Sequence, residues 1–212
     1  MATRSSTALK PRKQPHQARS LVTVEAVFEA TIQILLSDGC ERITTTRVAD
    51  RAGVSVGTLY QYYPNKQALL YAVLQRHLSR VGDTVETAAR SVHHAPLAAM
   101  VAAIVDAFVR AKLQRLDEAR ALYCVANQLE AIEPVEGLRL RNCAAISAML
   151  ATAPGVRFDD LALTSYTFCA ALVGPTRAIL TGGAPPKMLC ELPAQLESLC
   201  VGYLEHESKR KV

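Results

Sequence analysis

Apolar residues recur every three to four positions through most of this 212-residue chain, which is the spacing of side chains on one face of an α-helix. One such stripe covers residues 24–36, with Thr23 as a cap and Asp38-Gly39 as a stop. Sustained alternation of apolar and polar residues, which would indicate strands, is nearly absent. The pattern therefore predicts an all-α protein.

Two short helices joined by a glycine turn are predicted within residues 44–66. Thr45 or Thr46 can cap the first helix, since a threonine oxygen accepts a hydrogen bond from a free N–H group of the first turn. Gly53 lies where this helix must stop, because glycine adopts the left-handed conformation at little cost.

The second helix of the pair is predicted from Val56 to Tyr62, with Ser55 as its cap and Pro64 after its end. Leu59 and Tyr63 lie one turn apart and are expected in the core beneath the pair. Two helices joined by a turn of three or four residues form a helix-turn-helix, which places its second helix in the major groove of DNA. The segment therefore predicts DNA binding.

Helical spacing continues beyond Pro64, in segments bounded by Pro, Gly or Asp. Asn65 is expected to cap a long helix that ends near Arg90. Five more helices are predicted over residues 97–115, 118–131, 134–151, 159–181 and 186–207. Pro175 predicts a kink or break near Gly174, and Pro193 suggests that the regular part of the last helix begins there.

The positive charge is concentrated near the start of the chain. Residues 1–66 hold nine Lys and Arg against five Asp and Glu, whereas residues 67–212 hold fifteen against fourteen. Five basic residues and no acidic one lie within residues 1–20: Arg4, Lys10, Arg12, Lys13 and Arg19. We expect residues 1–19 to form a flexible basic arm that contacts phosphates or the minor groove. The alternative is a solvated tail that contacts nothing.

The residue types of catalytic and metal sites do not form a recognisable motif. The sequence has no Gly-rich phosphate loop, no GxSxG and no HExxH, so we expect no catalytic residues and no cofactor. The six cysteines include no CxxC pair and no zinc spacing, and adjacent His93 and His94 suit solvent better than a metal. We interpret the cysteines as small buried residues, with a thiol switch as the alternative.

Neither a signal peptide nor a membrane-spanning run is apparent. The longest apolar run, residues 97–105, has nine residues, whereas a span requires about twenty. We therefore expect a cytoplasmic protein with no membrane partner.

The last two predicted helices contain very few charges. Arg177 is the one charged residue of 161–180, and Glu191 and Glu197 are the two of 189–204. Such helices offer no wide polar face to water, so we expect a homodimer in which each subunit contributes both helices to a four-helix bundle. The alternative is burial of both helices inside a monomer.

The order of these features and one local motif resemble the TetR family of bacterial transcriptional regulators. The residues that carry the resemblance are Thr45-Thr46, Val48-Ala49, Ala52-Gly53-Val54-Ser55, Gly57-Thr58-Leu59-Tyr60, Tyr62-Tyr63, Lys66 and Leu69. The resemblance covers roughly residues 20–70, and from Arg90 onward it rests on length and helix number.

The resemblance implies a three-helix DNA-binding domain (residues 20–66) joined to a larger helical domain for ligand binding and dimerisation (residues 67–208). It implies a repressor that binds a palindromic DNA operator as a homodimer and is released by a small apolar effector. Alternatives are a constitutive DNA-binding dimer without a ligand, a cysteine-based redox-sensing regulator and an all-helical enzyme.

By the same resemblance, the DNA contacts lie on the two motif helices and at the start of the long helix. Thr45, Thr46 and Lys66 would contact phosphates, and the second motif helix would face base edges. In that helix, Val56 offers only an apolar contact to a thymine methyl, whereas Gln61 is suited to hydrogen-bond adenine. The implied contacts are Thr45, Thr46, Arg47, Ser55, Val56, Gly57, Thr58, Tyr60, Gln61, Tyr62 and Lys66.

The effector site implied by the resemblance lies among the later helices. Six polar candidates are Tyr123, Asn127, Gln128, Arg139, Asn142 and Tyr166, and three apolar candidates are Met100, Phe108 and Phe168. We expect at least one of Asn127 and Gln128 to face inward. The alternative for each residue is an ordinary place in a helical core.

Overall fold

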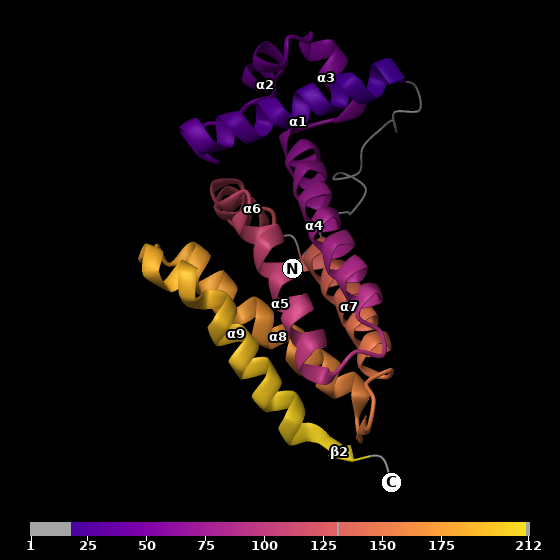
Figure 1. Ribbon diagram of the computed structural model, residues 1–212. Helices are drawn as coiled ribbons and strands as arrows, with labels where there is room; N and C mark the ends of the chain where they lie inside the picture. Colours follow the sequence, from indigo (N-terminus) through magenta and orange to yellow (C-terminus); the bar gives the residue numbers. More distant parts are fainter. Residues whose placement is uncertain (1–17, 131, 211–212) are drawn as a thin grey trace, which may run out of the picture. The chain divides into compact units, whose positions relative to one another are not determined.

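The computed structural model describes residues 18–130 and 132–210, which form nine helices and two three-residue strands (Figure 1). The helices are α1 (Ala18–Asp38), α2 (Thr45–Ala52), α3 (Val56–Tyr62), α4 (Lys66–Ser91), α5 (Leu97–Leu113), α6 (Leu116–Gln128), α7 (Ile132–Leu150), α8 (Leu161–Thr181) and α9 (Pro186–Glu207). The prediction of an all-α protein is confirmed. The strands β1 (Val156–Phe158) and β2 (Ser208–Arg210) pair antiparallel, and three residues are too few to reveal a strand by alternation.

The chain divides into two compact units. Unit 1 comprises Met1–His77 and Asp117–Ile132, and unit 2 comprises Leu78–Leu116 and Glu133–Val212. Helix α4 contributes to both units, whereas α6 belongs to unit 1. Most of the predicted basic arm lies outside the described residues.

Unit 1 contains a small core under α1, α2 and α3. Helix α1 runs across the other two (Figure 1), and the apolar stripe predicted in it is largely buried. Leu59 and Tyr63 are buried in this unit, as predicted, and Ile43 and Val48 are buried with them, whereas Val54 is half-buried. Residues 20–38 of α1 are also long and apolar enough for a membrane span, but the core helix of a soluble protein and a signal sequence pass the same test.

The helix caps of the motif are formed by single side chains. Thr44, not Thr45 or Thr46, caps α2: its backbone is extended and its hydroxyl accepts a hydrogen bond from Arg47 N at 3.3 Å. Gly53 ends that helix with φ of 67°, in the left-handed region predicted for it. Ser55 and Asn65 cap α3 and α4 as predicted, accepting from Thr58 N at 3.0 Å and Ala68 N at 2.7 Å.

Both internal prolines lie within continuous helices. Helix α8 passes through Pro175, and α9 begins at Pro186 and passes through Pro193. A break at Pro175 and a start of the last helix at Pro193 are therefore wrong, and a kink at Pro175 stays a prediction. Leu172 and Leu180 are buried on either side of Pro175, and this packing offsets the hydrogen bond that proline cannot donate. The Thr176 hydroxyl donates to the Leu172 carbonyl at 2.7 Å in the same turn.

Unit 2 is built around α5, which packs against α8 and α9 (Figure 1). Its core includes Met100, Ile104, Phe108, Phe168 and Cys200, all of them buried. The second half of α4 and α7 also contribute buried residues to this core.

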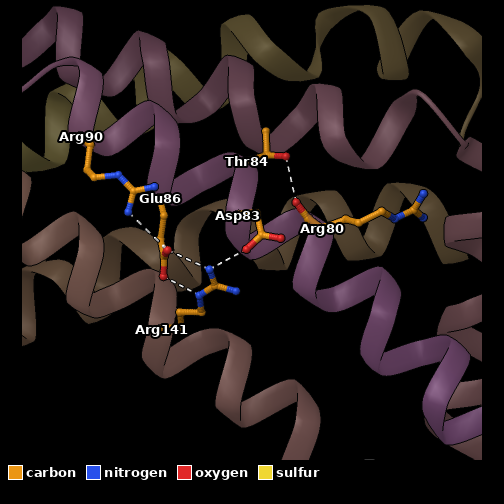
Figure 2. Close-up of polar contacts among 6 residues, drawn as sticks. All are labelled: Arg80, Asp83, Thr84, Glu86, Arg90 and Arg141. Atoms are coloured by element: carbon orange, nitrogen blue, oxygen red, sulfur yellow. Dashed lines mark hydrogen bonds and ion pairs between the residues drawn. The ribbon is translucent and has the colours of Figure 1, made fainter. Parts of the chain in front are cut away.

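An ion-pair cluster joins the second half of α4 to α7 within unit 2. Figure 2 shows the Arg141 guanidinium between Asp83 and Glu86, with Nη2 at 2.7 Å from Asp83 Oδ1 and 2.8 Å from Glu86 Oε2. Arg141 Nε donates to the other oxygen of Glu86, and Arg90 lies on the far side of that carboxylate. A Cβ at position 82 would lie 3.0 Å from the ends of both Arg141 and Leu138, so Gly82 permits this approach of the two helices.

Arg141→Ala is expected to lower the free energy of unfolding by about 1 kcal/mol at pH 7, since the pair is bidentate but partly exposed. The hydrogen bond from Arg141 holds the pKa of the Glu86 carboxyl below its ordinary value of 4.5. A lowered folded-state pKa stabilises the fold above about pH 4.5, and this stabilisation is lost as the pH falls through the folded pKa. Urea unfolding at pH 7 and at pH 3 measures both effects.

The control for this variant is Arg110→Ala, which removes an i,i+4 pair with Asp106 in which both side chains are exposed. It should change stability by less than about 0.5 kcal/mol. An equal loss in both variants, or a loss for Arg141→Ala that is undiminished at pH 3, would contradict the role given to Glu86.

Candidate nucleic-acid interface

The N-terminus of α2 presents free backbone N–H groups beside hydroxyl side chains. Thr45 and Thr46 occupy its first turn, the former half-buried and the latter exposed. The positive end of a helix dipole and its unpaired N–H groups attract anions, so this end suits a phosphate. Thr45 and Thr46 both lie at this end of α2, and phosphate binding by them stays a prediction.

One side of α3 is open to solvent and the other is buried. Ser55, Gly57, Tyr60 and Gln61 are exposed, and Leu59 is 0% exposed. Val56 and Thr58 are half-buried between the two sides. Most of the residues predicted to face DNA thus share one face of the helix.

The structure brings together two of the predicted contacts from different helices. The Tyr60 phenol oxygen lies 3.1 Å from Thr45 Oγ1, so the exposed tyrosine of α3 is held beside the first turn of α2. On α3 itself, the Ser55 and Thr58 hydroxyls lie 2.8 Å apart. These bonds orient hydroxyl groups at the surface where a phosphate or base edge would bind.

Tyr62 does not share the exposed face. Its side chain is 8% exposed and its ring lies 6.4 Å from the ring of Tyr63, centroid to centroid. Burial raises the pKa of the neighbouring Tyr63 phenol well above its ordinary value. The burial of Tyr62 fits a role in supporting α3 better than a base contact.

The basic side chains of unit 1 already contact other parts of the unit. Arg47 pairs with Asp38 and donates to the Arg42 carbonyl at 2.9 Å, and Arg51 donates to Gln33. Lys66 Nζ donates to the Cys40 carbonyl at 3.2 Å. A lysine ammonium has three donors, so this bond leaves Lys66 able to bind a phosphate, whereas the Asp38 carboxylate offsets the charge of Arg47.

The predicted effector residues fall into two groups. Met100, Phe108, Phe168 and Asn142 are buried in unit 2. The Asn142 Oδ1 atom is also buried, and none of the described residues gives it a hydrogen bond. A buried acceptor without a donor costs free energy, which a bound donor would recover.

The remaining effector candidates are not buried: they are exposed or half-buried side chains. Tyr166 is exposed on α8 and its ring lies under the Arg139 guanidinium, 4.6 Å from centroid to Cζ. Asn127 and Gln128 are both exposed on α6, so the expectation that one faces inward is wrong. Gln128 instead accepts a hydrogen bond from Cys40, a contact between distant residues that no local pattern predicts. Tyr123 is half-buried on the same helix.

Comparison with known families gives two matches. Residues 27–73 match the family described as "Bacterial regulatory proteins, tetR family". Residues 96–204, about half of the chain, match "Tetracyclin repressor-like, C-terminal domain". The two matches cover the motif and most of unit 2.

Among curated proteins, the chain is similar to the HTH-type transcriptional repressor KstR of Mycobacterium tuberculosis, at 41% identity over 63 residues. It is also similar to the nucleoid occlusion factor SlmA of Actinobacillus pleuropneumoniae, at 43% identity over 53 residues. The matched segments cover 30% and 24% of this chain, and only 29% and 26% of those relatives. The shared segment supports a common DNA-binding motif in proteins with different tasks.

Among solved structures, a protein of Mesorhizobium loti described as a TetR-family transcriptional regulator superposes with a TM-score of 0.75 at 16% identity. The superposition covers 90% of this chain and 98% of that one. A TetR family regulator of Marinobacter aquaeolei gives a TM-score of 0.63 at 19% identity, covering 87% and 96%. At these identities the likeness concerns the fold.

Proposed function

The chain belongs to the TetR family of bacterial transcriptional regulators, and we propose that it is a repressor that binds a palindromic operator as a homodimer. The observation that carries the proposal is the exposed face of α3 beside the free N-terminus of α2. The name of the relative KstR, a repressor, supports the direction of regulation. A symmetric dimer would hold its two α3 helices about 34–36 Å apart, one turn of DNA.

For the DNA contacts, we assign phosphates to Thr45, Thr46 and Lys66. Base edges are assigned to the exposed face of α3, chiefly Tyr60 and Gln61. The exposure of these two side chains supports the assignment. Ser55, Gly57 and Thr58 would bring the helix backbone against the groove, and Val56 would add an apolar contact.

The proposed dimer forms through α8 and α9. Leu163, Tyr166 and Val173 are exposed at spacings of three and seven residues, so they form one apolar face of α8. Leu199 is exposed on α9. Apolar faces of this kind are buried between subunits in helix bundles.

Two glycines of these helices support the same interface. No atom lies within 4 Å of the position that a Cβ would occupy at Gly174 or Gly202. Glycine inside a helix costs about 1 kcal/mol relative to alanine, and none of the described residues packs against either position. Close approach of helices from a second copy gives a reason for both residues.

We also propose that unit 2 binds a small, largely apolar effector with a hydrogen-bond donor, which would satisfy Asn142 Oδ1. Helix α4 would transmit its presence, since it begins at Lys66 and its second half is held to α7 by Arg141. Effector binding that favours another conformation of α4 would release the DNA. The second candidate is a constitutive dimer without an effector. It would be favoured if no apolar compound raised the melting temperature of the protein.

The proposed setting is the bacterial cytoplasm, where such a regulator meets DNA. The family assignment also favours a role without catalysis. An all-helical enzyme remains the less favoured alternative, and no cofactor is proposed.

DNA affinity is expected to fall steeply with salt, because bound phosphates displace condensed counterions. Lys66→Ala should lower the slope of log K against log salt by about 0.9 per subunit, one phosphate contact. The measurement is fluorescence anisotropy from 50 to 300 mM KCl, with a duplex selected by the wild-type protein from a random pool.

Lys187→Ala is the control for that titration, since Lys187 is an exposed lysine on α9. It should leave the slope unchanged. Melting temperatures of both variants separate the phosphate contact from the loss of the bond between Lys66 and the Cys40 carbonyl. A wild-type affinity that does not vary with salt would refute the proposed interface.

A further inference from the structure

Two cysteines that are far apart in the sequence meet within unit 1. Cys40 is buried in the turn between α1 and α2, and Cys124 is exposed on α6. Cys40 Sγ donates a hydrogen bond to Gln128 Oε1 at 2.6 Å, and Gln128 lies one helical turn after Cys124. Cys124 is also near enough to Cys40 to contribute to the raised pKa of the Cys40 thiol. The pair has no part in the DNA contacts assigned above.

The two thiols differ in access to solvent. Cys124 is open to a small oxidant, whereas Cys40 is covered by unit 1. Burial, with a smaller contribution from the Cys124 thiol, raises the pKa of Cys40 to about 11, so Cys40 remains a protonated thiol at neutral pH. An oxidant would therefore reach Cys124 first, and Cys40 would be the resolving cysteine.

We propose that Cys40 and Cys124 are a peroxide-sensitive pair whose disulfide joins the turn before α2 to α6 and weakens DNA binding. The Cys124 thiolate attacks hydrogen peroxide, breaks its O–O bond and becomes a sulfenic acid, releasing hydroxide. The released hydroxide takes the proton of Cys40 and becomes water, and the Cys40 thiolate attacks the sulfenic sulfur, forms the S–S bond and expels the second oxygen as hydroxide. The proton that Cys124 lost converts this hydroxide to the second water. Overall, two thiols lose two electrons and two protons, and one peroxide becomes two waters.

The effect on DNA binding follows from the position of Cys40, and this part of the inference rests on the proposed DNA interface. The Cys40 carbonyl accepts the bond from Lys66, and Thr44 four residues later caps α2. A disulfide holds its sulfurs about 2.05 Å apart, much closer than two thiols in contact, so oxidation draws the turn toward α6. It also ends the hydrogen bond from Cys40 to Gln128. The phosphate-binding end of α2 and Lys66 would both be displaced.

The other cysteines are less suited to this reaction. Cys169 and Cys200 are buried in unit 2, and burial raises the pKa of Cys200 to about 12. Cys143 is half-buried and lies next to Cys169, which makes that pair the chief competitor. Cys190 is exposed on α9, as Cys124 is on α6, and it provides a matched control.

The test treats the full-length protein with hydrogen peroxide after reduction by dithiothreitol and removal of the reductant. Disulfides are mapped by mass spectrometry of non-reduced peptides, and DNA affinity is measured with the selected duplex. We expect a peptide linking Cys40 to Cys124, and an affinity about tenfold lower that dithiothreitol restores. Cys124→Ser and Cys40→Ser should each remove both effects, whereas Cys190→Ser should behave as wild type.

Each outcome decides a separate statement. Failure of the reduced protein to bind DNA would refute the proposed function, while the mapped disulfide would still test the cysteine pair. A disulfide between Cys143 and Cys169 alone, or no disulfide, would overturn the pair. A Cys40–Cys124 disulfide without a change in affinity would overturn its regulatory effect. Because Cys124 is exposed, Cys124→Ser keeps the test valid even if Cys40→Ser fails to fold.

Discussion

Leu163→Glu is expected to convert the proposed dimer into monomers and to lower DNA affinity by about 100-fold or more, since two linked half-sites bind 10²–10⁴-fold tighter than one. Leu163 is 59% exposed near the start of α8, on the same face as Tyr166 and Val173. In a bundle with a second copy, the glutamate would lie in an apolar interface, where an unpaired charge is costly. Sedimentation velocity and anisotropy with the selected duplex measure the two effects.

The matched control is Leu140→Glu, because Leu140 is 56% exposed on α7 and lies outside the α8–α9 face. This variant should remain dimeric and bind DNA as the wild type does. Far-UV circular dichroism of both variants should match the wild type at low temperature, because both leucines are exposed within their own unit. Loss of the dimer should lower the melting temperature of Leu163→Glu alone. A dimer that survives Leu163→Glu, or dissociates equally with Leu140→Glu, would place the interface elsewhere.

The motif was predictable because its determinants are local. The αL residue Gly53 and the caps Ser55 and Asn65 act within four residues of themselves, and all three have the predicted roles. Two details in this region differ from the prediction: Tyr62 is buried, and the first cap is another threonine. Three consecutive threonines can each act as a cap, so composition alone does not distinguish them, and the structure has Thr44 in that role.

The arrangement of the later helices was less accessible from the sequence. The rotation of α6 about its own axis, which leaves both Asn127 and Gln128 exposed, depends on its packing in unit 1 rather than on its own composition. The Arg141 cluster and the bond between Cys40 and Gln128 join distant residues, which local periodicity cannot reveal. The continuity of α8 through Pro175 likewise depends on the buried leucines around it, which a local helix penalty does not include.

Leu59→Ala and Tyr60→Ala, at adjacent positions of α3, are expected to weaken DNA binding for different reasons, the first through lost stability and the second through a lost contact. Leu59 is 0% exposed, so its truncation leaves a cavity and should lower the free energy of unfolding of the DNA-binding unit by about 2–5 kcal/mol. Tyr60 is 41% exposed, so its truncation should change stability by less than about 0.5 kcal/mol. Its DNA affinity should nevertheless fall about tenfold, or about 1.4 kcal/mol.

Urea unfolding and anisotropy of the same preparations separate the two effects, and Tyr60→Phe refines the second. Phenylalanine keeps the ring but loses the hydroxyl that meets Thr45 Oγ1 at 3.1 Å. If the ring packs against the groove, Tyr60→Phe should retain most of the affinity; if the hydroxyl binds a phosphate, it should resemble Tyr60→Ala. If Tyr60→Ala unfolded as readily as Leu59→Ala, Tyr60 would be a core residue and not a DNA contact, and the proposed interface would lose its central residue.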